Sequence, residues 1–294
     1  MSIGKSRLLS LVPSQLSRKQ QDLINLNSGS IEALNKHLND PKYEFEEMIK
    51  DREIALDLGL NRVAEKYLSI LKEALSWDKL SVERINSDLK DPSIAEFIAF
   101  QDRARPVKRL QDVYKRIEGP DSRCYGLFNA HLRFPVSFVF LRLTNGLASK
   151  LSDLENKSYD NKDSCIFYSI TSPFRGLKGI EFAGRLIKSV MSIVAEEVPS
   201  IEIFATFSPM PAFRAWLDSH SPGLTNLTRE QVEGYRDELV EACRLYLNTR
   251  ADPVTRFHLR NGAAIGPIRF LADINNETSF KQSYGIQVNY LYST

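Results

Sequence analysis

The chain has 294 residues, of which 43% are hydrophobic and 26% charged, as in an ordinary globular protein of one large or two smaller domains. A net charge of +2 excludes a global field that would attract nucleic acid or an anionic membrane, so we expect neither as a partner. The cysteines Cys124, Cys165 and Cys243 are too few and too scattered for a disulfide framework, and no histidine spacing is typical of a metal site. No run reaches the roughly 18 apolar residues that a membrane span needs. These features predict a metal-free, cytoplasmic protein.

The first part of the chain is predicted to be helical. Residues 14 to about 118 contain few glycines, and apolar side chains recur every three to four positions between 51 and 77. Such spacing is typical of an amphipathic helix. We therefore expect an all-α helical bundle domain over residues 1–128.

The composition changes after residue 130. Runs rich in β-branched and aromatic residues alternate with helical patterns. The expected strands are 134–144, 165–170, 201–207, 268–272 and 285–292, and the expected helices are 180–197, 212–218, 229–247 and 253–261. Alternation of this kind produces layered α/β or α+β structures. The fold class predicted for the whole chain is α+β, with a mixed α/β domain over residues 129–294.

The stretch 169–181 joins an expected strand to an expected helix. Gly176 and Gly179 would let the backbone approach a ligand, and Arg175 and Lys178 add positive charge near the helix start. Free N–H groups and the positive dipole end of a helix suit a pyrophosphate. The spacing matches neither a GxGxxG nor a P-loop pattern, so an ordinary strand–loop–helix turn stays open as an alternative.

Ser208 and His258 are the candidates for chemistry. Ser208 follows an expected strand, at the end where α/β proteins usually place their sites, although it could instead cap the next helix. His258 can move a proton near neutral pH, and its spacing alone also fits a buried structural histidine. Arg256 and Arg260 lie two positions away on either side, so in a helix they point away from His258 and receive no catalytic role.

Five motifs, in one order, resemble the malonyl-CoA decarboxylase family. Residues 167–181 resemble its FYSIS…QGLxGVEL stretch, 204–213 its FSSLSPIPGF, 252–263 its DPVAxFHLxNGA, 268–273 its INWLAD and 285–292 its GLMVNYRY. The resemblance implies a GNAT-like (acetyltransferase-type) domain over 129–294, whose mixed sheet splits to admit coenzyme A. It also implies that residues 1–128 form an oligomerisation module, so we expect a homo-oligomer.

The same resemblance implies a set of site residues. Ser208 and His258 match the family's catalytic serine and histidine. Residues implied in coenzyme A or acyl binding are Lys178, Gly179, Ile180, Glu181, Phe182, Ala183, Gly184, Ser169, Arg175, Asn261 and Tyr290. The substrate would be an acyl-CoA thioester, and the reaction requires no metal or organic cofactor.

The leading hypothesis is therefore decarboxylation of malonyl-CoA or a close malonyl thioester. An alternative is a GNAT-type acyltransferase that passes an acyl group to a small molecule or a carrier protein, and a third is a non-catalytic acyl-CoA-binding scaffold. Arg175 stands where the family usually has glutamine, Gly266 and Pro267 replace bulky residues, and Phe270 replaces a tryptophan. These departures leave the acyl group open, and also whether coenzyme A or an acyl carrier protein holds it.

Overall fold

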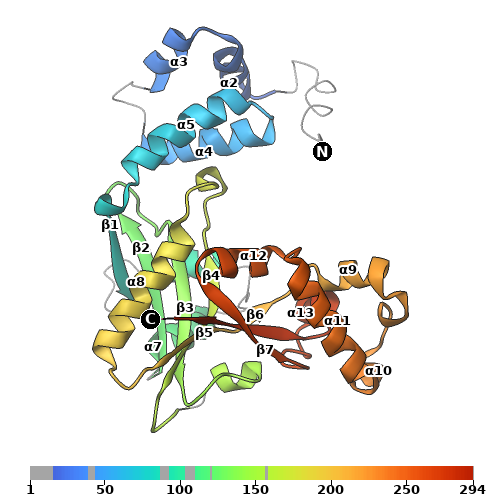
Figure 1. The fold of residues 1–294 in the computed structure, drawn as a ribbon. Helices are drawn as coiled ribbons and strands as arrows, with labels where there is room; N and C mark the ends of the chain where they lie inside the picture. Colours follow the sequence, from blue (N-terminus) through green and yellow to red (C-terminus); the bar gives the residue numbers. More distant parts are fainter. Residues whose placement is uncertain are drawn as a thin grey trace. The chain divides into compact units, whose positions relative to one another are not determined.

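The computed structural model describes residues 16–38, 44–86, 93–102, 110–119, 121–155 and 158–293. A helical N-terminal region is followed by a mixed sheet with helices, which confirms the predicted α+β class (Figure 1). The chain divides into two compact units. The first comprises Met1–Ser81, Leu127–Ser137 and Ser172–Phe182, and the second comprises Val82–Gly126, Phe138–Thr171 and Ala183–Thr294. Each unit uses segments from both sides of residue 128, and the predicted domain boundary there stays a prediction.

Four helices form most of the described part of the first unit. They are α2 (Arg18–Ser28), α3 (Ile31–Leu38), α4 (Phe45–Asp57) and α5 (Asn61–Ala74). Helix α5 buries Val63, Tyr67 and Leu71, which recur every four residues. This confirms the amphipathic pattern that predicts a helix in this region.

The prediction that residues 14–118 are helical throughout is wrong at residues 80–85, which form strand β1 (Leu80–Ile85). This strand stands at one end of the sheet and leaves much of its length exposed. Its apolar alternation covers only Leu80 to Glu83 and is broken at Arg84, so the strand pattern is short. Helices α6 (Ser93–Gln101) and α7 (Leu110–Glu118) follow as expected. Strand β2 (Ser122–Asn129) was not expected, since it contains a glycine and a buried arginine, Arg123, that pairs with Glu197.

The sheet has eight strands in the order β1-β2-β3-β4-β5-β8-β6, and β7 pairs with β8 off this path. The remaining strands are β3 (Ser137–Thr144), β4 (Ser164–Thr171), β5 (Ile203–Thr206), β6 (Ser208–Pro209), β7 (Ala263–Arg269) and β8 (Gln287–Tyr292). Strand β4 pairs with β5 in parallel. The pairing of β3 with β4 and the pairing of β5 with β8 are antiparallel. The sheet is therefore mixed, as predicted.

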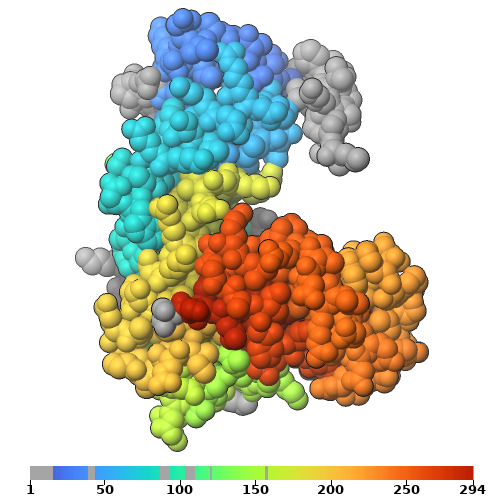
Figure 2. Space-filling model, in the orientation of Figure 1, coloured from blue at the N-terminus to red at the C-terminus, as the bar shows by residue number. Residues whose placement is uncertain are grey.

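Helix α8 (Phe182–Glu197) follows β4 and has the buried face that its sequence predicts. The buried side chains are Phe182, Leu186, Ile187, Val190, Met191 and Val194. Later helices are α9 (Phe213–His220), α10 (Arg229–Val232), α11 (Arg236–Thr249), α12 (Pro253–Arg260) and α13 (Glu277–Ser283). Helices α9, α11 and α13 pack together, and the orange and red segments form one continuous surface on the face shown in Figure 2.

The strand predicted at residues 268–272 is only partly correct. Strand β7 starts at Ala263, directly after α12, and ends at Arg269. Its first half contains Gly266 and Pro267, which have low strand propensity and hide it from a sequence pattern. The register with β8 shifts between Ile265 and Ile268, so Gly266 and Pro267 lie in a bulge.

Candidate active site

Helix α12 holds His258, and the start of this helix is firmly fixed. Asp252 caps it, because its Oδ1 accepts hydrogen bonds from the backbone N–H groups of Val254 (2.8 Å) and Thr255 (3.1 Å). Its Oδ2 accepts a further bond from the hydroxyl of Tyr246 at 2.9 Å. A carboxylate at this position satisfies free N–H groups and suits the positive end of the helix. The cap therefore sets the position of His258 along the helix.

Ser208 and His258 are in direct contact. Ser208 Oγ lies 3.2 Å from His258 Nε2, and the two side chains are only 5% and 4% exposed. Ser208 belongs to β6, which pairs with Val288 of β8. The residue before α9 is Ala212, and no side chain caps that helix, so the alternative role of Ser208 as its cap is wrong. Two residues that lie 50 positions apart in sequence are thus brought together.

The pair lies where two parallel strands part. Pairing between β4 and β5 ends at Phe167 and Thr206, and the N–H of Phe207 donates to the carbonyl of Phe167 at 2.9 Å. The next residue, Ser208, pairs with β8 instead, while β4 continues to Thr171 beside β3. Ser208 is therefore the first residue beyond the split.

Further hydroxyl groups extend the pair into a chain. The Ser208 hydroxyl donates to Thr206 Oγ1 at 2.8 Å, and that oxygen also accepts the backbone N–H of Tyr290 at 3.1 Å. On the other side, His258 Nδ1 lies 2.9 Å from the hydroxyl of Tyr292. The Tyr290 ring stacks on the imidazole with 4.6 Å between ring centroids. Both nitrogens and one face of the imidazole are thereby held in place.

Burial controls the charge at this site. It lowers the pKa of His258 from 6.5 to about 3, because desolvation disfavours the imidazolium. Burial also raises the pKa of the Tyr292 hydroxyl. At neutral pH the site therefore contains a neutral imidazole and a protonated tyrosine.

Two other predicted residues of the second unit have clear partners. Asn261 caps the end of α12, where its Nδ2 donates to the carbonyl of Phe257 at 2.8 Å, and it lies against Gly184 of α8. The hydroxyl of Ser169 donates to buried Asp102 at 2.7 Å. This bond gives Ser169 a structural role, and its predicted contact with substrate stays a prediction.

Of the predicted coenzyme A residues, Arg175 and the range 178–182 belong to the first unit, where α4 and α5 support them, and Ala183 and Gly184 belong to the second. The guanidinium of Arg52 donates to the carbonyls of Ala64 (3.0 Å) and Gly176 (2.6 Å). Arg175 pairs with Asp57 and with Glu53, so two carboxylates already share its charge. Gly179 has a φ of +99°, a conformation that glycine adopts readily. Lys178 and Glu181 are exposed.

Thr206, Tyr292, Asp252 and Arg52 were not predicted from the sequence. Tyr292 offers the clearest signal, since it follows Tyr290 by two positions on a predicted strand and so shares its face. The partners of Arg52 are backbone carbonyls, which no residue pattern identifies. Asp252 precedes Pro253, and this pair is a usual signal of a capped helix start.

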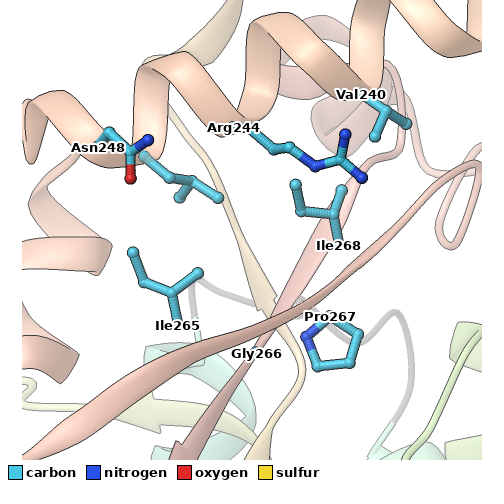
Figure 3. Close-up of a pocket in the computed structure, with 8 residues that line it drawn as sticks. Val240, Arg244, Asn248, Ile265, Gly266, Pro267 and Ile268 are labelled. Carbon is cyan, nitrogen blue, oxygen red and sulfur yellow. The ribbon is translucent and has the colours of Figure 1, made fainter.

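A pocket of about 620 Å³ lies elsewhere in the second unit, between α11 and β7 (Figure 3). Its lining residues are Val240, Arg244, Leu247, Asn248, Ile265, Gly266, Pro267 and Ile268, none of which is a predicted site residue. Among the described residues, no three His, Cys, Asp or Glu side chains gather as a metal site would require. The helices in the described part of the chain are all too short or too polar to cross a membrane.

The mixed sheet, in which β4 and β5 part after a short parallel pairing, gives the chain a GNAT-like α+β fold. Consistent with this, the fold is shared with a GNAT-like decarboxylase, GphF, solved in complex with isobutyryl-CoA (16% identity, TM-score 0.50, covering 72% of this chain and 98% of that one). The protein-family model named malonyl-CoA decarboxylase C-terminal domain matches residues 80–246 and 241–294 of this chain. The chain belongs to the malonyl-CoA decarboxylase family.

Individual relatives support the family and the fold. The mitochondrial malonyl-CoA decarboxylase of Anser anser anser is 25% identical over 76% of this chain and 54% of its own length. The chain therefore spans about half the length of the curated relatives it matches. The crystal structure of malonyl-CoA decarboxylase from Agrobacterium vitis has a TM-score of 0.76 and 23% identity, over 98% of this chain and 86% of that one.

Proposed function

We propose that the chain is a carboxy-lyase that converts malonyl-CoA, or a close malonyl thioester, to acetyl-CoA and CO2. The observation that carries the proposal is the buried contact between Ser208 Oγ and His258 Nε2, beside the split of the sheet. Membership of the malonyl-CoA decarboxylase family supports it. A serine and a histidine supply the hydrogen-bond donor and the proton that decarboxylation of a thioester requires.

The reaction breaks the bond between the α-carbon and the carboxylate, and the electron pair forms a thioester enolate as CO2 leaves. When substrate binds, the Ser208 hydroxyl turns away from Thr206 Oγ1 and donates to the substrate carboxylate or the enolate oxygen, where negative charge develops. The Nε2 proton of His258 then passes to the α-carbon, and the ring regains a proton from solvent. Neutral imidazole is sufficient as the donor because an enolate is a strong base, and neutral histidines serve as electrophiles in other enzymes.

Residues 178–184 are assigned to the pyrophosphate of coenzyme A, with Arg175 beside them. The positive φ of Gly179 and its position just before α8 support this assignment, since a helix start presents free N–H groups to an anion. Asn261, Tyr290 and Ser169 are assigned to the binding of coenzyme A or of the acyl group. The proposed reaction requires no metal or organic cofactor beyond the coenzyme A that the substrate carries. An acyl carrier protein is the other carrier to test.

Homo-oligomer formation through residues 1–128 and a cytoplasmic location are further proposals. Cys124, Cys165 and Cys243 are all free and buried, which suits a reducing compartment. Sedimentation of the purified chain would test the first proposal, and imaging of the tagged full-length protein would test the second.

The test is to incubate the purified protein with malonyl-CoA and follow acetyl-CoA and CO2 by mass spectrometry. We expect Ser208→Ala and His258→Asn to lower kcat by about 100-fold or more. His220→Asn is a matched control, because this exposed histidine stacks on Trp216 and has its contacts on α9. Near-normal turnover by a folded His258→Asn variant would exclude the mechanism. Acyl-amine product that appears only when an amine is added would indicate an acyltransferase, and binding without product would indicate a scaffold.

A further inference from the structure

The hydrogen bonds around His258 have a direction, and the contact between Ser208 and Thr206 determines it. Without substrate, the Ser208 hydroxyl donates its one proton to Thr206 Oγ1, which leaves Ser208 Oγ free only to accept. His258 Nε2, 3.2 Å from Ser208 Oγ, must then be the donor of that contact. The neutral ring carries its single proton on Nε2.

The other ring nitrogen is consequently an acceptor. A neutral imidazole with its proton on Nε2 has a lone pair on Nδ1, and the group that faces Nδ1 is the Tyr292 hydroxyl, at 2.9 Å. Tyr292 is buried, so its hydroxyl keeps its proton at neutral pH and donates it to Nδ1. The sequence of donors is Tyr292 to His258, His258 to Ser208, and Ser208 to Thr206.

We propose that Tyr292 is a positioning residue that fixes His258 in the tautomer with its proton on Nε2, the nitrogen that faces Ser208. The inference goes beyond the proposed decarboxylation and rests on it only for the catalytic consequence. As the Nε2 proton leaves for the α-carbon, negative charge develops on the ring, and the bond that Tyr292 donates to Nδ1 strengthens. Hydrogen bonds to a charged acceptor are about twice as strong as neutral ones, so Tyr292 favours the proton-transfer step.

Tyr290 provides a matched control on the same strand. Its ring stacks on the imidazole, but its hydroxyl lies 2.6 Å from Thr255 Oγ1 and makes no bond to either ring nitrogen of His258. Tyr290→Phe and Tyr292→Phe each remove one phenolic oxygen from a buried aromatic side chain. Only the second change removes the partner of Nδ1.

The test is nitrogen NMR of the full chain labelled with 15N-histidine, whose four histidines include His258, assigned by its loss in His258→Gln. In the wild type we expect Nε2 to carry the proton and Nδ1 to show the shift of a hydrogen-bonded acceptor. Tyr292→Phe should move the Nδ1 resonance or mix the tautomers, whereas Tyr290→Phe should leave the proton on Nε2. A wild-type proton on Nδ1, or a Tyr292→Phe spectrum identical to the wild type, would overturn the proposal.

Turnover provides the second measurement. Loss of a hydrogen bond to a charged group corresponds to at least about a 10-fold fall in kcat for Tyr292→Phe, with KM changed less than about 3-fold. A kcat of Tyr292→Phe equal to that of the wild type would refute the proposed effect of Tyr292 on proton transfer. If the phenylalanine variant does not fold, 3-fluorotyrosine at position 292 keeps the shape and shifts the Nδ1 resonance through its more acidic hydroxyl. A wild type inactive on malonyl-CoA would reject the proposed function, while the tautomer would still be read from the spectrum.

Discussion

Gly184 of α8 lies directly against Asn261 at the end of α12, and a Cβ on this glycine would overlap the Asn261 side-chain amide. The amide is itself held by its bond to the carbonyl of Phe257. Two segments from distant parts of the sequence therefore approach closely at a residue that has no side chain.

We predict that Gly184→Ala destabilises the protein by about 1–3 kcal/mol, because the new methyl group must displace Asn261. Within a helix such a change would otherwise stabilise by about 1 kcal/mol. Gly234→Ala is the matched control, since its new methyl group would have no other atom within 4 Å and its φ is not positive. Urea unfolding of both variants measures the difference. A Gly184→Ala variant as stable as Gly234→Ala would contradict the contact.

Arg52 should be important for the stability of the first unit. Arg52→Ala removes the bonds to the carbonyls of Ala64 and Gly176, and we expect a loss of about 3 kcal/mol from two charge-assisted hydrogen bonds. Lys66→Ala, on the exposed face of α5, should change stability by less than about 0.5 kcal/mol. Thermal unfolding with limited proteolysis of residues 172–182 compares the two. Equal resistance in both variants would show that Arg52 does not hold this segment.

His258 makes stability depend on pH. In the unfolded chain it gains a proton below its ordinary pKa of 6.5, whereas in the folded protein its pKa is about 3. The unfolded state therefore binds more protons between these values, and stability falls as pH decreases from about 6.5 towards 3. By pH 4.5 we expect a cost of about 2–3 kcal/mol that His258→Gln does not show. Parallel urea titrations at pH 7 and pH 4.5 test this, and identical pH slopes in the two proteins would argue against a neutral buried histidine.

The three cysteines should be unreactive in the folded protein. Cys124, Cys165 and Cys243 are buried, and burial raises the pKa of each thiol, that of Cys243 to about 12. Since the thiolate is the reactive form, a colourimetric thiol reagent should detect no thiol at pH 8 and all three after denaturation. Rapid reaction of one native thiol would show that its segment opens readily.

The parts of the site that could be predicted are those in which residue type and local pattern agree. His258 follows a helix start marked by Asp252 and Pro253, and Ser208 follows an apolar strand, so both could be placed on their elements. Their contact could not be derived from spacing, because it depends on how β6 and α12 both meet β8. It was expected only through the family resemblance.

The elements that were not predicted share a physical cause. The alternation in β1 covers only Leu80 to Glu83 before Arg84 breaks it, and β7 contains Gly266 and Pro267, so neither shows a sustained strand pattern. The role of Tyr292 is hidden for another reason. A tyrosine on a buried strand resembles any core residue until the atom that its hydroxyl meets is known.

The bulge in β7 also affects the edge of the sheet, because β7 pairs with β8 off the main strand order. Gly266 presses so closely on β8 that a Cβ would lie 2.6 Å from the carbonyl oxygen of Asn289, and Pro267 next to it has no N–H to offer. A further strand that paired with β7 would need a continuous row of backbone hydrogen bonds. The bulge interrupts that row in the middle of the strand. The same two residues that depart from the family's bulky pair thus protect this edge from pairing with another chain during folding or at high concentration.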